Sequence, residues 1–405
     1  RTGGNAKRGE WEGVYYPMGA VYLGDPDPTI QKTLDDIGIE PVTVPRPVDA
    51  WYTKGGVVPD ILHHPMDMPY SRDVRKSFRD AWQYFQDLGT SKDCPPIPVQ
   101  PANARQLAYD DDSFLARYGR RWARPVIDLL DQYSRSVFGI GIDQVSSFGM
   151  ITQFAGEFPP IRSLPGGNAA IAEKLTDRLQ GKIRTGCFTY RVEKDGEMYR
   201  VSYLQDDKPH VVKARSVVVS APQHLAAHMV ADLPADRRDM MRHVRHGAYL
   251  VGLLFLHEPI CDIAFDIWTP NRCFTDLVVS DWVASEGHPK PGRRTVMSAY
   301  MPQGELPGRA NLLQPDYNEW REQLLSDVEK TFPGARKKVA GVQFVRYGHP
   351  MIIPYPGYIR HVIPKLQEPV GRVFFAHSDT GALPCIEGCI YEAVRTSTRV
   401  QNVLA

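Results

Sequence analysis

The chain has 405 residues, of which 42% are hydrophobic and 23% charged, and its 48 Lys and Arg residues nearly balance its 47 Asp and Glu residues. This composition is globular, and the charge balance argues against nucleic acid as a partner. No apolar run reaches the ~20 residues that span a bilayer, so we expect a soluble chain without a transmembrane segment. Its compartment stays unknown, either the cytoplasm or, if a signal was removed, an exported location. The length favours two domains.

Cysteine and histidine patterns do not predict a metal site. The six cysteines are too scattered for a disulfide scaffold. Cys385 and Cys389 are four residues apart, but no second Cys/His pair lies near them in the sequence. The pair His63-His64 lacks a carboxylate or a third histidine in register, and surface-loop residues are the alternative for it.

Helical patterns dominate the first part of the chain after residue 70. Residues 70–88 place apolar side chains on one face and end before a glycine: Val74, Phe78, Trp82, Phe85 and Leu88, then Gly89. A second helical stretch starts near the cap cluster 110–113 and is interrupted at Pro125. The segment FGIGID at 138–143 has Gln144 where a phosphate-binding fingerprint needs its third glycine, so it predicts a turn.

Strand patterns follow. Alternating residues after position 182, with turns at Asp195-Gly196 and Asp206-Asp207, predict a three-stranded meander. The apolar run 216–222 predicts a strand buried on both faces in a parallel sheet. After a helix at about 317–332, the tail predicts a strand from Gly371, a polar turn, and a helix from about Ile386 whose amino end faces the turn.

Four segments, taken in order, resemble the flavin-containing amine oxidase superfamily. They are GGNAAIAEKLTDRLQGKIRTG, the meander, ARSVVVSAPQHL and GRVFFAHSDTGALPCIEGCIYEAV. The resemblance implies an α/β, two-domain flavoprotein of amine-oxidase type with interleaved domains. Its Rossmann-like FAD-binding domain would comprise residues 1–45, 155–245 and 336–405. Residues 46–154 and 246–335 would form the substrate domain.

The same resemblance accounts for the opening residues RTGG. Members of the superfamily begin with a strand, a GxGxxG turn and a helix, and later carry an Arg-x-Gly-Gly turn. Arg1, Gly3 and Gly4 match that later turn, so we expect the sequence to start after the pyrophosphate-binding unit. Processing, or a separate chain that supplies this unit, would explain its absence.

The resemblance also implies FAD as the cofactor and assigns positions around it. Gly3, Gly4 and Asn5 would lie near the ribose and phosphates, although the superfamily commonly has Arg where Asn5 stands. Gly19 and Ala20 would pass close to the isoalloxazine, and the main chain at Phe188 would contact the adenine. The remaining implied cofactor positions are Ala221 at a strand end, His377 in place of a usual glycine, Asp379 near the ribityl and phosphate groups, and the Ile386 amide near flavin N1/C2=O.

Departures from the superfamily limit what it implies about the substrate. The amine-cage aromatics would fall near Pro350 and Cys385, and the lysine beside flavin N5 near Val251, so neither feature is expected. The catalytic candidates that remain are His349 as a base, Tyr355, and Cys385 against the flavin. Ordinary lining or packing roles are the alternative for all three.

The resemblance therefore implies an FAD-dependent oxidoreductase acting on a small or medium organic molecule. Oxidation of a C–N bond, with hydride transfer to flavin N5, is the leading hypothesis. The alternatives are C–C desaturation, C–O oxidation, and a non-catalytic or partner-completed subunit that retains the fold. Electrons would pass to oxygen or to an acceptor protein.

Overall fold

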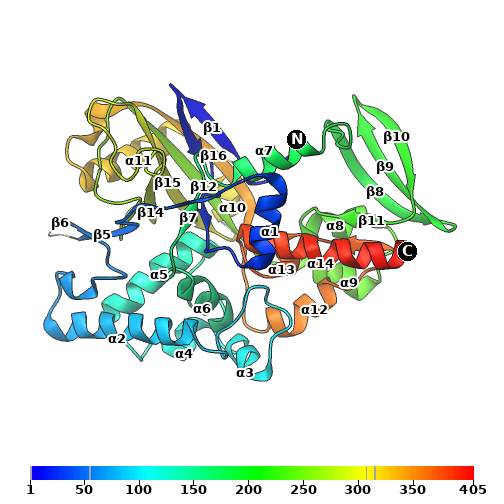
Figure 1. Cartoon of the computed structure of the whole chain (residues 1–405), viewed down its shortest axis with the longest axis horizontal. Coiled ribbons are helices and arrows are strands. Elements are labelled where there is room, and N and C mark those ends of the chain that lie inside the picture. The colour runs from blue at the N-terminus through cyan, green and yellow to red at the C-terminus, as the bar shows by residue number, and fades with distance from the viewer. Residues whose placement is uncertain (1, 54–55, 307, 314–315) are drawn as a thin grey trace.

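A seven-stranded sheet forms the largest layer of the molecule (Figure 1). The computed structural model describes residues 2–53, 56–306, 308–313 and 316–405. The strand order across the sheet is β16 (Val339–Ile352), β12 (His246–Leu256), β15 (Thr295–Gly304), β14 (Asp276–Val279), β13 (Asp266–Trp268), β5 (Asp49–Thr53) and β6 (Gly56–Pro59). All neighbours pair antiparallel except β13 and β5, which are parallel, so an early segment of the chain completes the edge of a sheet built from much later residues.

Both faces of this sheet are covered at its centre. Ten of the 11 residues of β12 are buried, as the run HGAYLVGLLFL suggests. Helix α11 (Tyr317–Thr331) packs on one face, where a Cβ at Gly252 would lie 2.7 Å from the Leu324 side chain. The end of α5 (Arg124–Phe138) meets the same strand, where a Cβ at Gly247 would lie 2.5 Å from the Phe138 carbonyl oxygen. Glycine at both positions permits these close contacts.

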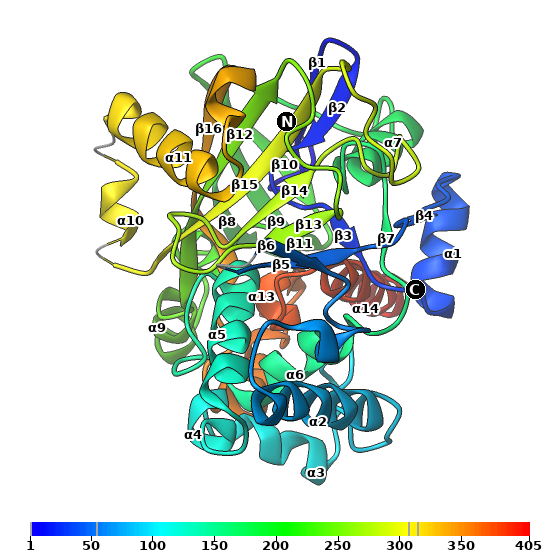
Figure 2. The ribbon, with the colours of Figure 1, turned by 90° about the vertical axis from the view of Figure 1, so that its left-hand side faces the viewer.

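A group of helices lies beyond α5, at the far end from the sheet (Figure 2). It contains α2 (Arg72–Gly89), α3 (Ala104–Leu107), α4 (Phe114–Tyr118) and α6 (Ser147–Ala155). The amphipathic helix predicted for 70–88 is confirmed, with Phe78, Trp82, Phe85 and Leu88 buried in one core. Pro125 stands in the first turn of α5, and Gly139 closes that helix in the left-handed region, so FGIGID is a turn as predicted.

The predicted meander is confirmed as β8 (Cys187–Asp195), β9 (Met198–Gln205) and β10 (Lys208–Ala214). Next, β11 (Val217–Val219) pairs in parallel with β17 (Val373–Phe375), as expected for a parallel strand. The expectation that 216–222 is buried on both faces is wrong at Val218, which is 45% exposed. Val219, the next residue along, is buried, so among the described residues only one face of β11 is covered.

The remaining elements connect these layers. They are β1 (Arg8–Trp11), β2 (Val14–Pro17), β3 (Tyr22–Leu23), α1 (Pro28–Ile37), β4 (Val42–Thr43), β7 (Arg162–Ser163), α7 (Ala169–Arg178), α8 (Gln223–Met229), α9 (Ala235–Arg242), α10 (Gly308–Asn311), α12 (Ile363–Leu366), α13 (Ser378–Gly381) and α14 (Ile386–Leu404). The turn predicted between β17 and α14 contains the short helix α13, whose first turn is capped by His377.

Helix α14 lies between the large sheet and the helical group in Figure 2. It joins the two ends of the chain, because the Gly24 amide donates to Glu387 Oε1 at 2.6 Å and the Tyr391 hydroxyl contacts Asp27. Ile390 packs with Ile30, Leu34 and other residues of α1 and α7. The start of α14 is thereby fixed in the interior, where the candidate site lies.

Candidate functional site

The amino end of α14 is the first component of the site. The helix begins at Ile386, as predicted, and Cys385 is its N-cap, with Sγ accepting the Gly388 amide at 3.4 Å. The first amides of a helix have no intrahelical acceptor, and the helix dipole makes this end positive. An electron-rich group is therefore stabilised in front of Ile386. The contact of the Ile386 amide with a flavin stays a prediction.

Asp379 is the second component, and it is completely buried. Its carboxylate accepts a hydrogen bond from the backbone N–H of Gln223 at 2.8 Å. It also contacts His246 Nε2 at 2.8 Å and His377 Nδ1 at 3.1 Å. Burial opposes ionisation, but the hydrogen bonds and charges of His246 and His377 outweigh it and hold the pKa of Asp379 well below its ordinary value. Asp379 thus anchors α8, β12 and α13 to one point. Its contact with a cofactor, and that of His377, stay predictions.

Three histidines pack beside Asp379. The rings of His224 and His349 lie 4.2 Å apart, and His246 meets both edge-on, at 5.4 and 5.6 Å. Burial, reinforced by His246 for His224 and by Arg309 for His349, lowers the pKa of each to about 4. Both imidazoles are therefore neutral at neutral pH and able to accept a proton. His349 was a sequence candidate, whereas His224 was missed, and its only signal was its place after an apolar strand.

The other two catalytic candidates have separate surroundings. Cys385 packs against the main core, and burial raises the pKa of its thiol well above the ordinary value. The Tyr355 ring lies 5.1 Å from that of Tyr358. The Arg245 guanidinium lies 5.5 Å from the centroid of the Tyr355 ring. In the described part of the chain, no hydrogen bond or ring contact joins His349, Tyr355 and Cys385 to one another. Their catalytic roles stay predictions.

The glycine turn near the start of the chain adopts a conformation that suits glycine. Gly3 and Gly4 have φ values of 88° and 54°, and the Ala6 amide donates to the Gly3 carbonyl at 2.9 Å. A Cβ at Gly3 would lie 2.8 Å from the Ala6 carbonyl oxygen. Asn5 is exposed beside this turn, and Arg1 lies outside the described residues. The predicted ribose and phosphate contacts are untested.

The segment at Gly19 and Ala20 is held against the large sheet. The Tyr300 hydroxyl donates to the Gly19 carbonyl at 2.5 Å, and the Tyr347 hydroxyl donates to the Met18 carbonyl at 2.7 Å. The Asn168 amide donates to the Ala20 carbonyl at 3.0 Å. These bonds fix the backbone that the resemblance places beside the isoalloxazine.

The two other implied positions differ in exposure. Phe188 is 68% exposed on β8, and Ala221 is half-buried after β11 and packs against the main core. An exposed side chain at Phe188 is compatible with a contact made by its main chain. Both assignments stay predictions.

A pair of buried carboxyl groups on the sheet was missed by the sequence analysis. Asp266 on β13 and Asp276 on β14 are 5% and 2% exposed. Asp266 Oδ2 accepts the Tyr22 hydroxyl at 2.5 Å and the Trp268 indole N–H at 2.7 Å, while its Oδ1 is buried without a hydrogen-bond partner. Burial, followed by repulsion from Asp276, raises the pKa of Asp266 well above its ordinary value. Burial raises that of Asp276 to about 6.

Aromatic rings and a third acid surround this pair. Tyr300 pairs with Asp276 across β14 and β15, and its hydroxyl reaches the Gly19 segment. The Tyr133 ring lies 5.6 Å from that of Trp268, and its hydroxyl donates to Glu157 at 2.7 Å. Burial raises the pKa of Glu157 to about 7. We call Asp266, Asp276 and Glu157 the carboxyl cluster. The one sequence signal for Asp266 was an acid inside the apolar run AFDIW.

Several buried amide groups in this region have no partner in the described structure. The Gln223 side chain is fully buried with both Oε1 and Nε2 unpaired, and Asn168 Oδ1 and Gln153 Nε2 are also unpaired. An unsatisfied buried polar group costs about 1–3 kcal/mol. These atoms lie on or beside the segments that the resemblance assigns to FAD. Polar groups of bound FAD would form the hydrogen bonds that these atoms lack. The residues present therefore fit the cofactor.

Comparison of the sequence with known proteins identifies its family. Residues 1–401 match the family model described as flavin containing amine oxidoreductase. The flavin-containing amine oxidase A of Sus scrofa is 20% identical over 264 residues, which are 60% of this chain and 47% of that protein. The chain thus spans about half the length of the curated relatives it matches.

Solved structures share the fold. Wild-type putrescine oxidase bound to putrescine matches with a TM-score of 0.76 and 13% identity, over 99% of this chain and 91% of that one. Cyclohexylamine oxidase from Brevibacterium oxydans matches with a TM-score of 0.73 and 14% identity, over 100% and 92%. The predicted α/β flavoprotein fold is confirmed. No helix among the described residues is long and apolar enough to cross a membrane. The chain belongs to the flavin-containing amine oxidoreductase family, whose members are FAD-dependent oxidoreductases.

Proposed function

We propose that this protein oxidises an amine at its C–N bond with FAD as cofactor. The observation that carries the proposal is the unpaired Oδ1 of Asp266, which is buried among the rings of Trp268 and Tyr22. The raised pKa of Asp266 favours its protonated form in the absence of a cation, and a substrate ammonium group would favour the ionised form, donate to the unpaired oxygen and contact the aromatic faces. A neutral alcohol or alkane carries no positive charge to do this.

In this reaction the substrate loses a hydride from the carbon next to nitrogen and a proton from nitrogen, giving an imine. When bound, FAD supplies the hydride acceptor. The positive end of α14 at Ile386 would stabilise the negative charge that develops there. Gly3, Gly4, Asn5, Gly19, Ala20, Phe188, Ala221, His377 and Asp379 would hold or position the cofactor, as the family resemblance implies.

The proton from nitrogen needs an acceptor that is unprotonated at neutral pH. Beside Asp266, the carboxyl group of Asp276 meets this condition, because its pKa of about 6 leaves it mostly ionised at neutral pH. His349 is also unprotonated, since its pKa is lowered to about 4. Three strands separate its strand β16 from β13, so it would not take a proton directly from a nitrogen held at Asp266. Cys385 and Tyr355 are then lining residues, since the raised pKa of each keeps it protonated. Positioning of the substrate by the carboxyl cluster would supply much of the remaining rate enhancement.

Anaerobic reduction of the protein-bound flavin tests the proposal. The full-length natural polypeptide is loaded with FAD and mixed with primary amines or with alcohols of the same carbon skeleton. Amines should bleach the flavin absorbance bands, and alcohols should not. A protein that remains colourless after FAD addition, or that is reduced equally by alcohols, would contradict the proposal. Oxygen uptake after reduction then separates an oxidase from a protein that requires an acceptor partner.

A further inference from the structure

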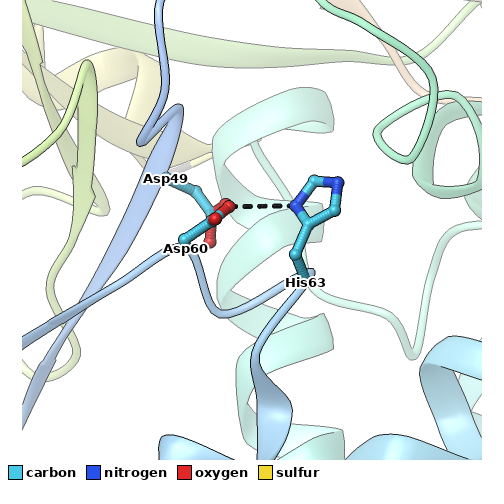
Figure 3. Close-up of side chains that lie close together, drawn as sticks. All are labelled: Asp49, Asp60 and His63. Carbon is cyan, nitrogen blue, oxygen red and sulfur yellow. Dashed lines mark hydrogen bonds and ion pairs between the residues drawn. The ribbon is translucent and has the colours of Figure 1, made fainter.

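A second cluster of ligand-type side chains lies at the start of β5, outside the proposed flavin site (Figure 3). Asp49 is the first residue of β5, and Asp60 and His63 belong to the segment that follows β6. One ligand atom from each of the three lies within 4.8 Å of the other two. His63 Nδ1 is 2.9 Å from Asp60 Oδ1, and His64 Nε2 is 3.5 Å from Asp60 Oδ2.

The structure thereby brings to His63 and His64 the carboxylates that the sequence pattern around this pair lacked. The turn that includes Asp60, which has a φ of 57°, brings two carboxylates into register with the histidine pair. Asp60 is held in place by its backbone, because its amide donates to the Asp49 carbonyl at 2.6 Å. The cluster is therefore built on a fixed backbone contact.

The charges of the two carboxylates are not equally compensated. Asp60 pairs with the Arg46 guanidinium through Oδ2. Asp49 is only 3% exposed and has no cationic side-chain partner within the described chain, although it accepts the backbone amides of Ile61, at 3.1 Å, and Leu62. Burial, followed by repulsion from Asp60, raises its pKa to about 7. Its oxygens point toward Asp60 and His63 (Figure 3), where a cation would offset the cost of ionising it. Two carboxylates and an imidazole nitrogen at ligand distance are together the donor set of a cation site.

We propose that Asp49, Asp60 and His63 bind a single zinc ion, with the fourth position left to water. Carboxylate oxygen and imidazole nitrogen are standard zinc ligands, whereas calcium and magnesium select oxygen ligands alone. Zinc–ligand bonds of ~2.0–2.2 Å place tetrahedral donors about 3.3 Å apart. His63 Nδ1 and Asp60 Oδ1, which are 2.9 Å apart, would open slightly, and the longer separations, up to 4.8 Å, would close. Arg46 would keep its contact with the outer oxygen of Asp60 and orient the ligating one.

Zinc at this position would tie the segment 60–64 to β5. Strand β5 pairs with β13 so that Asp49 lies opposite Asp266. The ion would therefore fix the sheet edge next to the carboxyl cluster. A stabilising role for the ion follows from this geometry, because it would bind the folded chain and not the unfolded one.

The test is zinc binding by the tag-free full-length protein, measured by isothermal titration calorimetry and by metal analysis after dialysis. We expect one zinc ion per chain, a raised thermal unfolding midpoint, and no competition from excess calcium or magnesium. His63→Ala should weaken binding at least about tenfold, since it removes one of three ligands. Asp49→Asn should do the same while keeping the acceptor for the Ile61 amide.

A matched control is His243→Ala, because His243 also pairs with an aspartate, Asp239, at 3.4 Å, but on an exposed helix without a second carboxylate. This variant should bind zinc like the wild type. Wild-type protein that retains no zinc, or equal binding by the wild type and His63→Ala, would overturn the proposal. Because these readouts do not use FAD or an amine, they are independent of the proposed function.

Discussion

At the scale of single residues, the environment of Asp266 is the feature that most constrains the substrate. One of its oxygens is satisfied by Tyr22 and Trp268, and the other is buried without a donor. Native proteins pair nearly all such atoms, so this oxygen needs a donor, which a ligand or an ordered water would supply. An ammonium group would supply both a hydrogen-bond donor for the unpaired oxygen and a positive charge, which no described side chain offers to Asp266.

Replacing Asp266 with Asn should therefore weaken amine binding. Hydrogen bonds to charged groups contribute about 1.5–3 kcal/mol, which corresponds to a KM for amines about 10- to 100-fold higher with little change in kcat. Steady-state kinetics measures this split. Asp281→Asn is the control, because it also removes a buried carboxyl group, bonded to Thr295, but beyond the end of β14. An unchanged KM in Asp266→Asn, or an equal rise in both variants, would contradict this role.

At the scale of elements, the crossing of α5 and β12 fixes the helix that carries Tyr133. Gly139 ends α5 with a φ of 73°, and its Cα is 3.0 Å from where a Cβ at Gly247 would lie. The Phe138 carbonyl is still closer, at 2.5 Å from the same point. Backbone atoms cannot move aside as a flexible side chain can, so the approach depends on glycine.

Gly247→Ala should accordingly destabilise the fold by about 1–3 kcal/mol, the usual cost of overpacking. Urea unfolding measures the change. Gly341→Ala, in the neighbouring strand β16, is the matched control, because its Cβ would meet only the Phe255 ring at an ordinary 3.7 Å. If both variants unfolded at the same urea concentration, the crossing would not be as tight as the distances indicate.

Local elements could be predicted from the sequence because their signals are local. The apolar spacing of α2 and the turns of the meander at Gly196 and Asp206-Asp207 depend on neighbouring residues only. The burial of β11 was predicted from its apolar run and is wrong at Val218, because burial depends on which layers cover a strand. The division into two interleaved domains is not tested and stays a prediction.

The candidate site was less predictable because long-range pairing assembles it. Strand β5 pairs with β13, which places Asp49 opposite Asp266, and no local pattern encodes that register. His224 and His349 come from α8 and β16 and meet only in the folded chain. Ile386 was located because its helix follows a polar turn and has apolar residues at near-helical intervals, whereas Asp266 had only its place inside an apolar run.

At the scale of the whole molecule, the histidines beside Asp379 predict how stability depends on pH. Burial lowers the pKa of His224 and His349 from 6.5 to about 4, so between these values the unfolded chain binds protons that the folded chain does not. These two histidines should therefore lower the free energy of unfolding as the pH drops from 6.5 to about 4, whereas the raised pKa values of Asp266, Asp276 and Glu157 contribute in the opposite direction. Asp379 adds a further loss below its ordinary pKa of 3.8, because its folded pKa is depressed.

Urea unfolding at a series of pH values measures this dependence. His349→Phe keeps an aromatic ring against His224 but removes one titrating group, so between pH 6.5 and about 4 its free energy of unfolding should rise relative to that of the wild type, by up to about 1.4 kcal/mol for each unit of falling pH. His243→Phe, at an exposed site, should differ from the wild type by the same amount at every pH. Equal slopes for the wild type and His349→Phe would contradict the contribution of His349.

The hydrogen bond from the Gly24 amide to Glu387 also constrains the order of events during biosynthesis. The amino end of α14 is positioned by residues from the opposite end of the chain, through Gly24, Asp27 and the apolar face of α1. A ribosome must therefore have translated beyond Glu387 before the early segments find their final neighbour. Because α14 is proposed to contribute to the flavin site, we expect cofactor binding to be a late event in the maturation of the nascent polypeptide, and fragments that stop short of α14 should be recovered without flavin.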